Sequence, residues 1–181
     1  MPGLAAFFRA VNLGGDSTLR MEELRTALNE SGLGPAETIL QSGNVVLRRD
    51  ARDPARLEGQ IERWLDRRLG LRTDVFVRTS EEWHEVVLGN PFSAAAREDP
   101  RHLTVLILKT APPPSAWADL SRGILGREVV RAAGRQGYVV YPDGIGYSRL
   151  TLDRIERTLG THGTLRNWNT VLKVNARLTD A

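Results

Sequence analysis

The sequence predicts an α+β protein with a ferredoxin-like βαββαβ N-terminal domain, residues 1–79, and a smaller α+β C-terminal domain of related βαββα order, residues 80–181. Three observations support this fold class. The 181 residues suffice for one domain or two small halves, β-prone runs alternate with amphipathic helical segments, and glycine-rich or asparagine-rich turns separate them. A composition of 41% hydrophobic and 26% charged residues is typical of a folded globular chain.

The N-terminal half begins with a compact apolar run at residues 5–11, which predicts a buried strand ending in a turn-rich segment. A helix is predicted from residue 20, because Met21, Leu24 and Leu28 share one face and Gly32 follows as a C-terminal cap. The runs 38–40 and 45–47 are β-prone and are joined by residues 41–44, which predicts a hairpin.

The next signals complete the βαββαβ order. Asp53 followed by Pro54 is a strong helix opening, and an apolar stripe continues from there until Gly70. Residues 75–77, Val-Phe-Val, then predict a fourth strand. Four strands and two helices in this order are typical of an antiparallel sheet with both helices on one face.

The C-terminal half opens with Thr79 and Glu82, whose spacing predicts a capping box and a helix ending at Gly89. Residues 102–108 form the clearest strand of the chain. The remaining predicted elements are a short helix at 115–120, a hairpin of 128–131 with 138–141, a helix at 152–159 closed by Gly160, and a last helix marked by Trp168, Val171, Leu172 and Leu178.

Composition limits the classes of function. The chain has no cysteine, which excludes disulfides and thiolate chemistry, and no apolar run reaches the roughly 20 residues that cross a bilayer. We therefore expect a cytoplasmic protein without a membrane partner. The three histidines fall on different elements without metal-ligand spacing, so no metal site is predicted, and nothing in the sequence identifies a cofactor. The net charge of +3 is weak evidence for nucleic acid.

Asn12, Gly14 and Gly15 lie between the first strand and the first helix, where backbone N–H groups can hold an anion. The segment lacks the spacing of a phosphate-binding glycine loop, so a plain tight turn and a ligand loop both stay open. Arg9, on the adjoining strand, is either an anion clamp or the partner of a carboxylate.

Two further clusters concentrate polar side chains. Gln41, Ser42 and Asn44 lie in the predicted hairpin turn, where they either cap the backbone or recognise a polar ligand. The second cluster opens the last predicted helix, where helix capping, a functional network and stacking of a nucleobase beside Trp168 are the alternatives; it comprises Arg166, Asn167, Asn169 and Thr170. No catalytic residue is predicted, because no pair of titratable groups stands out as acid and base.

Three segments together resemble the domain-of-unknown-function 1697 family. They are residues 8–15 with 21–24, where Ala10 stands in place of the family's glycine, residues 41–45, Gln-Ser-Gly-Asn-Val, and residues 164–171 with the upstream segment 146–150. The resemblance marks Ser148 and Arg149 as additional site candidates. The family has no assigned activity, so the resemblance implies a fold and marks positions without naming a reaction.

The leading hypothesis is a non-catalytic protein that binds a phosphorylated or other anionic small molecule at the junction of the two halves. Arg9, Arg149, Arg166 and the backbone of Gly14 and Gly15 would hold the ligand. One alternative is binding of single-stranded nucleic acid on a sheet face, where only Phe7, Phe8 and Phe76 are available for stacking. The other is an uncharacterised hydrolase or transferase. The sequence specifies neither the ligand nor the oligomeric state.

Overall fold

The computed structural model describes residues 3–9, 20–40, 42–49 and 53–180. Within these residues it contains two four-stranded antiparallel sheets and seven α-helices, which confirms the predicted α+β class. The first sheet has the strand order β2-β3-β1-β4. Its half comprises β1 (Leu4–Phe8), α1 (Met21–Glu30), β2 (Ala36–Ile39), β3 (Asn44–Leu47), α2 (Pro54–Leu69) and β4 (Val75–Thr79). This is the ferredoxin-like arrangement.

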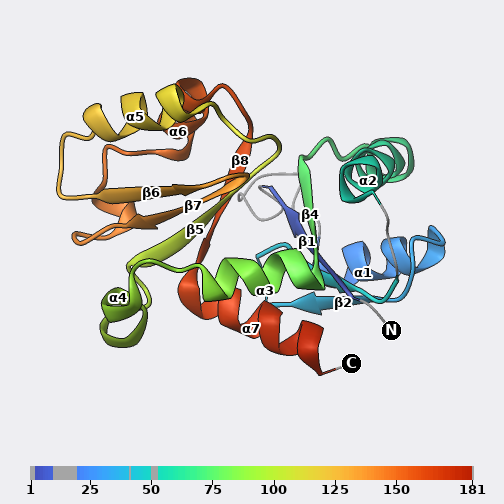
Figure 1. The fold of residues 1–181 in the computed structure, drawn as a ribbon. Coiled ribbons are helices and arrows are strands. Elements are labelled where there is room, and N and C mark those ends of the chain that lie inside the picture. The colour runs from blue at the N-terminus through green and yellow to red at the C-terminus, as the bar shows by residue number, and fades with distance from the viewer. Residues whose placement is uncertain (1–2, 10–19, 41, 50–52, 181) are drawn as a thin grey trace. The chain divides into compact units, whose positions relative to one another are not determined.

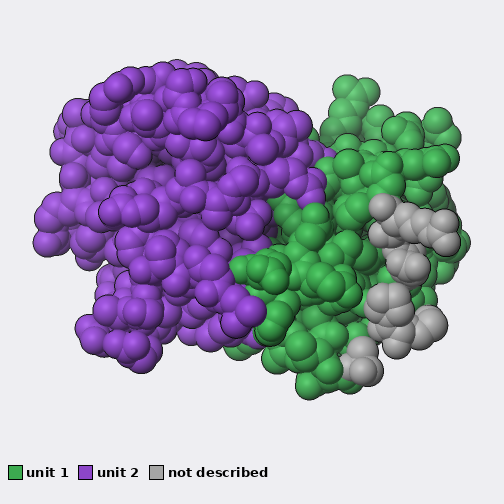
Figure 2. Space-filling model, viewed as in Figure 1, with its two compact units in different colours: residues 1–85, 173–181 green, residues 86–172 purple. Residues whose placement is uncertain are grey.

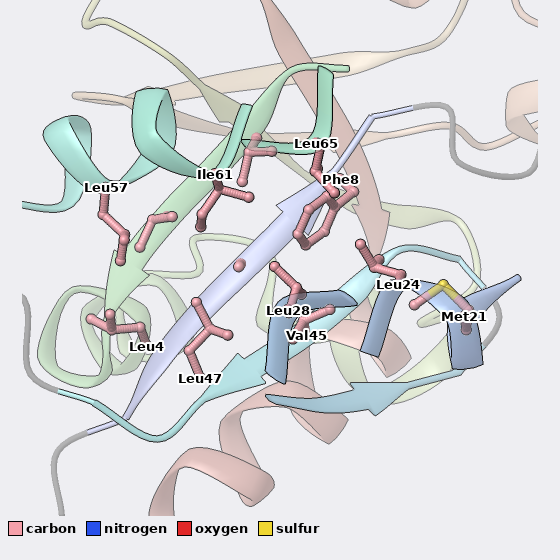
Figure 3. Close-up of a cluster of buried hydrophobic side chains, with 13 residues drawn as sticks. Leu4, Phe8, Met21, Leu24, Leu28, Val45, Leu47, Leu57, Ile61 and Leu65 are labelled. Atoms are coloured by element: carbon pink, nitrogen blue, oxygen red, sulfur yellow. The ribbon is translucent and has the colours of Figure 1, made fainter. Parts of the chain in front are cut away.

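Helices α1 and α2 cover one face of the first sheet (Figure 1). The alternate β1 residues Leu4, Ala6 and Phe8 point into this core, as the period of two in a strand requires. The helices contribute residues at helical spacing, and Figure 3 shows how these side chains meet the sheet: Met21, Leu24 and Leu28 from α1, and Leu57, Ile61 and Leu65 from α2.

The ends of α2 follow the predicted capping chemistry. The Asp53 carboxylate accepts a hydrogen bond from the Arg56 N–H (3.0 Å), and Pro54 occupies the first turn. Gly70 closes the helix in the left-handed conformation, at φ 62°, where its N–H donates to the Asp66 carbonyl (3.0 Å). Both predicted boundaries of this helix are confirmed.

The second sheet has the order β6-β7-β5-β8, which matches the first sheet position for position. Its half comprises β5 (Leu103–Leu108), α5 (Pro114–Arg122), β6 (Val129–Ala133), β7 (Gln136–Val140), α6 (Leu152–Leu159) and β8 (Gly163–Asn167). The predicted βαββα order is therefore extended by β8. The sequence predicts that Arg166 and Asn167 open the last helix, and this is wrong: they end β8, and the helix begins at Trp168.

Helices α5 and α6 pack on one face of the second sheet (Figure 1). Leu106 and Leu108 of β5 face this core with Trp117 of α5 and Ile155 of α6. A Cβ atom at Gly137 would lie 2.6 Å from the Trp117 ring, so the close approach of α5 to β7 requires glycine at this position.

The remaining elements are α3 (Ser80–Leu88), α4 (Ser93–Glu98), a short 3-10 helix (Ile145–Tyr147) and α7 (Trp168–Thr179). The predicted capping box precedes α3: the Thr79 N–H donates to Glu82 Oε2 (2.9 Å), and the Glu82 N–H donates to Thr79 Oγ1 (3.1 Å). Helix α4 has no counterpart in the sequence prediction. Among the described residues, no helix combines the length and apolar character that crossing a membrane requires.

Contacts between residues divide the chain into two compact units, residues 1–85 with 173–181 and residues 86–172 (Figure 2). The chain passes from one unit to the other within α3 and again within α7. The domain boundary between residues 79 and 80 stays a prediction.

Candidate functional site

Arg9 lies at the carboxyl end of β1, next to the segment that enters β4. Its backbone N–H donates to the Asp74 carbonyl (3.0 Å), and its Nη1 lies 3.4 Å from Asp74 Oδ2. Thr73, which precedes Asp74, also binds the end of β1, because its hydroxyl donates a hydrogen bond to the Arg9 carbonyl (2.5 Å). Of the two roles left open for Arg9, the partner of a carboxylate is therefore observed. Its role toward a ligand stays a prediction.

A pocket of about 500 Å³ opens beside Arg9, and we call it the Arg9 pocket. The last turns of α2 and the connection to β4 form its wall. Arg9, Glu62, Arg63, Asp66, Leu71, Arg72, Thr73 and Asp74 line it. Three guanidinium groups and three carboxylates thus share one small surface.

Each carboxylate of the Arg9 pocket has a partner. Glu62 Oε1 accepts a hydrogen bond from the Val75 N–H (2.8 Å), Asp66 Oδ1 lies 3.3 Å from Arg72 Nε, and Asp74 pairs with Arg9. Arg63 is exposed and makes no hydrogen bond or ion pair within the part of the chain that the structure describes. It is the arginine in this pocket that is not already paired with a carboxylate.

The hairpin turn between β2 and β3 lies at the same end of the sheet. The Phe8 N–H donates to the Gly43 carbonyl (2.8 Å), which places the turn beside the end of β1. Asn44 is buried, and its Nδ2 donates to the Ile39 carbonyl (3.1 Å) and to Ser42 Oγ (2.9 Å). These contacts are those of a backbone cap. The described part of this motif therefore lies beside the end of β1.

Four predicted site residues lie outside the described residues: Asn12, Gly14, Gly15 and Gln41. The third motif belongs to the other unit, which contains Arg166, Asn167, Asn169 and Thr170. The convergence of all three motifs at one site stays a prediction.

Arg166 lies on β8 opposite Val105 of β5. Its Nη1 donates to Thr164 Oγ1 and to the Leu165 carbonyl, both at 2.8 Å. Burial lowers the pKa of Arg166 to about 10, because loss of water disfavours the charged form. The guanidinium still carries its charge at neutral pH.

The upstream candidates Ser148 and Arg149 differ in their surroundings. Ser148 Oγ donates to Glu128 Oε1 and accepts from the Leu150 N–H (2.9 Å), so its hydroxyl fixes the chain after the 3-10 helix. Arg149 is exposed to solvent. The observed contacts give Ser148 a structural role.

Asn167 caps α7. Its Oδ1 accepts hydrogen bonds from the Thr170 N–H (2.9 Å) and from Thr170 Oγ1 (3.1 Å). Asn169, two residues along the chain, is exposed and forms no hydrogen bond in the described part of the structure. Of the alternatives for this motif, helix capping is therefore observed at Asn167 and Thr170.

Replacing Asn167 by alanine should lower the free energy of unfolding by about 0.5–2 kcal/mol, the usual cost of losing an N-cap side chain. Urea denaturation followed by circular dichroism measures the change. The control is Asn169→Ala, which should stay within about 0.5 kcal/mol of wild type because no contact is lost. An equal loss in both variants would contradict the capping role.

The sequence did not indicate Arg63 and Arg72 as site residues. The only local signal was the helical spacing of Glu62, Arg63 and Asp66 on the exposed side of α2. Pairing of β4 with β1 brings the end of α2 and its following connection to Arg9. In the described residues, no cluster of three or more acidic or histidine side chains has a geometry that could hold a metal ion.

Fold and site together define a class: an α+β protein built from two sheets of ferredoxin-like strand order, with a pocket of mixed charge at the end of the first sheet. The family model described as "Protein of unknown function (DUF1697)" matches residues 1–138, and the chain belongs to this family. The predicted family membership is thereby confirmed.

Among solved structures, the chain is similar to the conserved bacterial protein SP0830 from Streptococcus pneumoniae. The two share 20% sequence identity with a TM-score of 0.73, and the match covers 98% of each chain. At this identity the likeness shows the fold alone. No curated protein matches the sequence.

Proposed function

We propose that this protein binds a phosphorylated or other anionic small molecule in the Arg9 pocket. The observation that carries the proposal is the grouping of Arg9, Arg63 and Arg72 around one pocket whose three carboxylates are already engaged. A planar guanidinium group can donate two parallel hydrogen bonds to a phosphate or carboxylate. Three such groups on one surface are suited to an anion with several oxygen atoms.

The existing ion pairs do not oppose this binding strongly. In the Arg72–Asp66 pair the side chains are 88% and 48% exposed, and an ion pair in water contributes little to stability. An incoming anion can therefore take over the Arg72 guanidinium at small cost. The pocket lies at the carboxyl end of α2, where the helix dipole disfavours an anion by typically about 0.3–1 kcal/mol. One charge-assisted hydrogen bond from the Arg63 guanidinium, typically about 1.5–3 kcal/mol, outweighs this effect.

The size of the pocket supports a small ligand. Its volume of about 500 Å³ lies within the range that small-molecule sites usually have. For single-stranded nucleic acid the aromatic side chains of the sheet would have to be accessible to bases. Phe7, Phe8 and Phe76 are each at most 1% exposed, so they offer no stacking surface. Burial of these rings favours the small molecule.

A thermal-shift screen tests the proposal, with nucleotides, sugar phosphates, carboxylates and short single-stranded RNA as ligands. A ligand at about 100 times its dissociation constant should stabilise the fold by about 2.7 kcal/mol, which raises the melting temperature by roughly 5–11 °C for a chain of this length. Arg63→Ala should abolish the shift, because it removes the guanidinium of the pocket that is not already paired with a carboxylate. The variant should keep the fold, since Arg63 is exposed.

The matched control is Arg67→Ala. Arg67 is exposed on the same helix and carries the same charge, yet it does not line the Arg9 pocket, so this variant should keep the full shift. A shift that survives Arg63→Ala would reject the pocket as the site. A shift with RNA alone, falling steeply as salt is added, would favour nucleic-acid binding instead.

A further inference from the structure

The two halves of the chain correspond beyond their strand order. At the end of β1 the Arg9 N–H donates to the Asp74 carbonyl, and at the end of β5 the Lys109 N–H donates to the His162 carbonyl, both at 3.0 Å. The hairpin turns match as well. The Phe8 N–H donates to the Gly43 carbonyl (2.8 Å) in the first half, and the Leu108 N–H donates to the Arg135 carbonyl (2.9 Å) in the second. Arg9 and Asp74 in the first half thus correspond to Lys109 and His162 in the second.

The helix contacts repeat in the same places. Glu62 of α2 accepts from the Val75 N–H at the start of β4 (2.8 Å), and Glu156 of α6 accepts from the Gly163 N–H at the start of β8 (2.7 Å). An arginine follows each of these glutamates in the sequence, Arg63 and Arg157.

In both halves a threonine hydroxyl of the connection contacts a residue just after the first strand, although it donates in one half and accepts in the other. Thr73 Oγ1 donates to the Arg9 carbonyl, and Thr161 Oγ1 accepts from the Thr110 N–H (3.3 Å). Three separate features therefore recur in the two halves: the hydrogen bonds at the strand ends, the glutamate followed by arginine, and the threonine contact. The first half uses all of them to build the Arg9 pocket.

A second pocket of about 500 Å³ occupies the corresponding place in the second half. Asp153, Glu156, Arg157, Gly160, Thr161 and His162 line it. We infer that this Arg157 pocket is a second anion-binding site, equivalent to the Arg9 pocket by internal duplication and specific for the same phosphate-like class of ligand. This inference rests on the proposed function of the Arg9 pocket.

The charges of the Arg157 pocket favour weaker binding of the same kind of ligand. His162 stands where the first half has Asp74, which removes one carboxylate, but Asp153 adds another, so Asp153 and Glu156 face one arginine. Of these two carboxylates, Glu156 accepts a hydrogen bond from the Gly163 N–H. Arg157 is the one arginine among the residues that line it, against three in the Arg9 pocket. With fewer charge-assisted hydrogen bonds to offer, the Arg157 pocket should bind the same anion roughly tenfold or more weakly.

Isothermal titration calorimetry of the full chain with inorganic pyrophosphate tests the inference. Wild type should show two classes of site, one stronger and one weaker. Arg157→Ala should remove the weaker class and leave the stronger one, whereas Arg63→Ala should do the reverse. Arg97→Ala is the control, because Arg97 is exposed on α4 and lines neither pocket.

The outcomes separate this inference from the proposed function. A single class of site that Arg63→Ala abolishes and Arg157→Ala leaves intact would overturn the second site and keep the first. Binding that is lost only in Arg157→Ala would overturn the proposed function and keep a site in the second half. No heat of binding at millimolar pyrophosphate would overturn both.

Discussion

Replacing Glu58 by alanine is expected to lower the free energy of unfolding by about 3–5 kcal/mol, because it removes one partner of a buried ion pair. The Glu58 and Arg78 side chains are 4% and 2% exposed, and Glu58 Oε1 lies 3.7 Å from Arg78 Nη1. The same oxygen accepts a hydrogen bond from the Val77 N–H (2.7 Å). The variant therefore loses the carboxylate beside a buried guanidinium and the acceptor of a strand amide. Urea denaturation followed by circular dichroism measures the loss.

A double variant isolates the charge effect. Glu58→Leu combined with Arg78→Met replaces the ion pair by apolar side chains of similar size, and it should recover most of the stability that Glu58→Ala loses. Glu62→Ala is the matched control on the same helix. It also removes an acceptor from a β4 amide, but Glu62 is only half-buried whereas Glu58 is buried, so its loss should be smaller. Equal losses for Glu58→Ala and Glu62→Ala would refute the part assigned to Arg78.

Carboxylates on α2 and α6 also protect one edge of each sheet. Strand β4 lies at the edge of the first sheet and β8 at the edge of the second. An edge strand presents unpaired amides that invite association with other chains. Glu58 and Glu62 accept hydrogen bonds from two of these amides on β4, and Glu156 accepts one from an amide on β8. The same use of a helix carboxylate in both halves is further support for an internal duplication.

Local signals predict several helix ends and one hairpin well. The cap at Asp53, the left-handed Gly70 and the capping box of Thr79 with Glu82 each depend on residues within one or two turns of the chain. Such contacts can be recognised from spacing alone, because partner and position are fixed by helix geometry. The hairpin around Gly43 was predictable for the same reason, and Gly43 adopts a positive φ of 71°.

Strand β8 could not be recognised in this way. Residues 163–167 contain one apolar side chain, Leu165, so the alternation that indicates a strand is missing. The segment becomes a strand because it pairs with β5, with Leu165 opposite Leu106 and Arg166 opposite Val105. Because these partners lie far apart in the sequence, the local pattern of residues does not indicate the pairing. The polar residues before Trp168 were therefore assigned to the helix that follows.

The candidate site was predictable in part. The sequence singled out Arg9, and the structure gives it the carboxylate partner that was one of its two predicted roles. The βαββαβ order already implies that the fourth strand lies beside the first, which brings Asp74 to Arg9. The order does not determine which side chains of α2 reach that sheet end. Arg63 is distinguished from Arg67 and Arg68 only by the rotation and packing of the helix.

Replacing Trp83 by alanine is expected to cost about 3–5 kcal/mol of unfolding free energy, the usual effect of removing a large buried aromatic side chain. Trp83 of α3 is fully buried, and its ring centroid lies 4.6 Å from that of Phe7, with 37° between the ring planes. The variant leaves a cavity against β1 and loses an aromatic pair, which itself contributes about 0.5–1.5 kcal/mol. Urea denaturation measures the total.

Two controls test this explanation. Trp83→Phe keeps an aromatic ring against Phe7 and should lose clearly less than Trp83→Ala. Trp64→Ala removes a tryptophan that is only partly buried at the edge of the first core, and its loss should also be smaller. If Trp83→Ala cost no more than Trp64→Ala, the contact with Phe7 would not hold α3 on this face of the sheet. A large loss in Trp83→Ala alone would instead make the Phe7–Trp83 contact a main attachment of α3 to the first sheet.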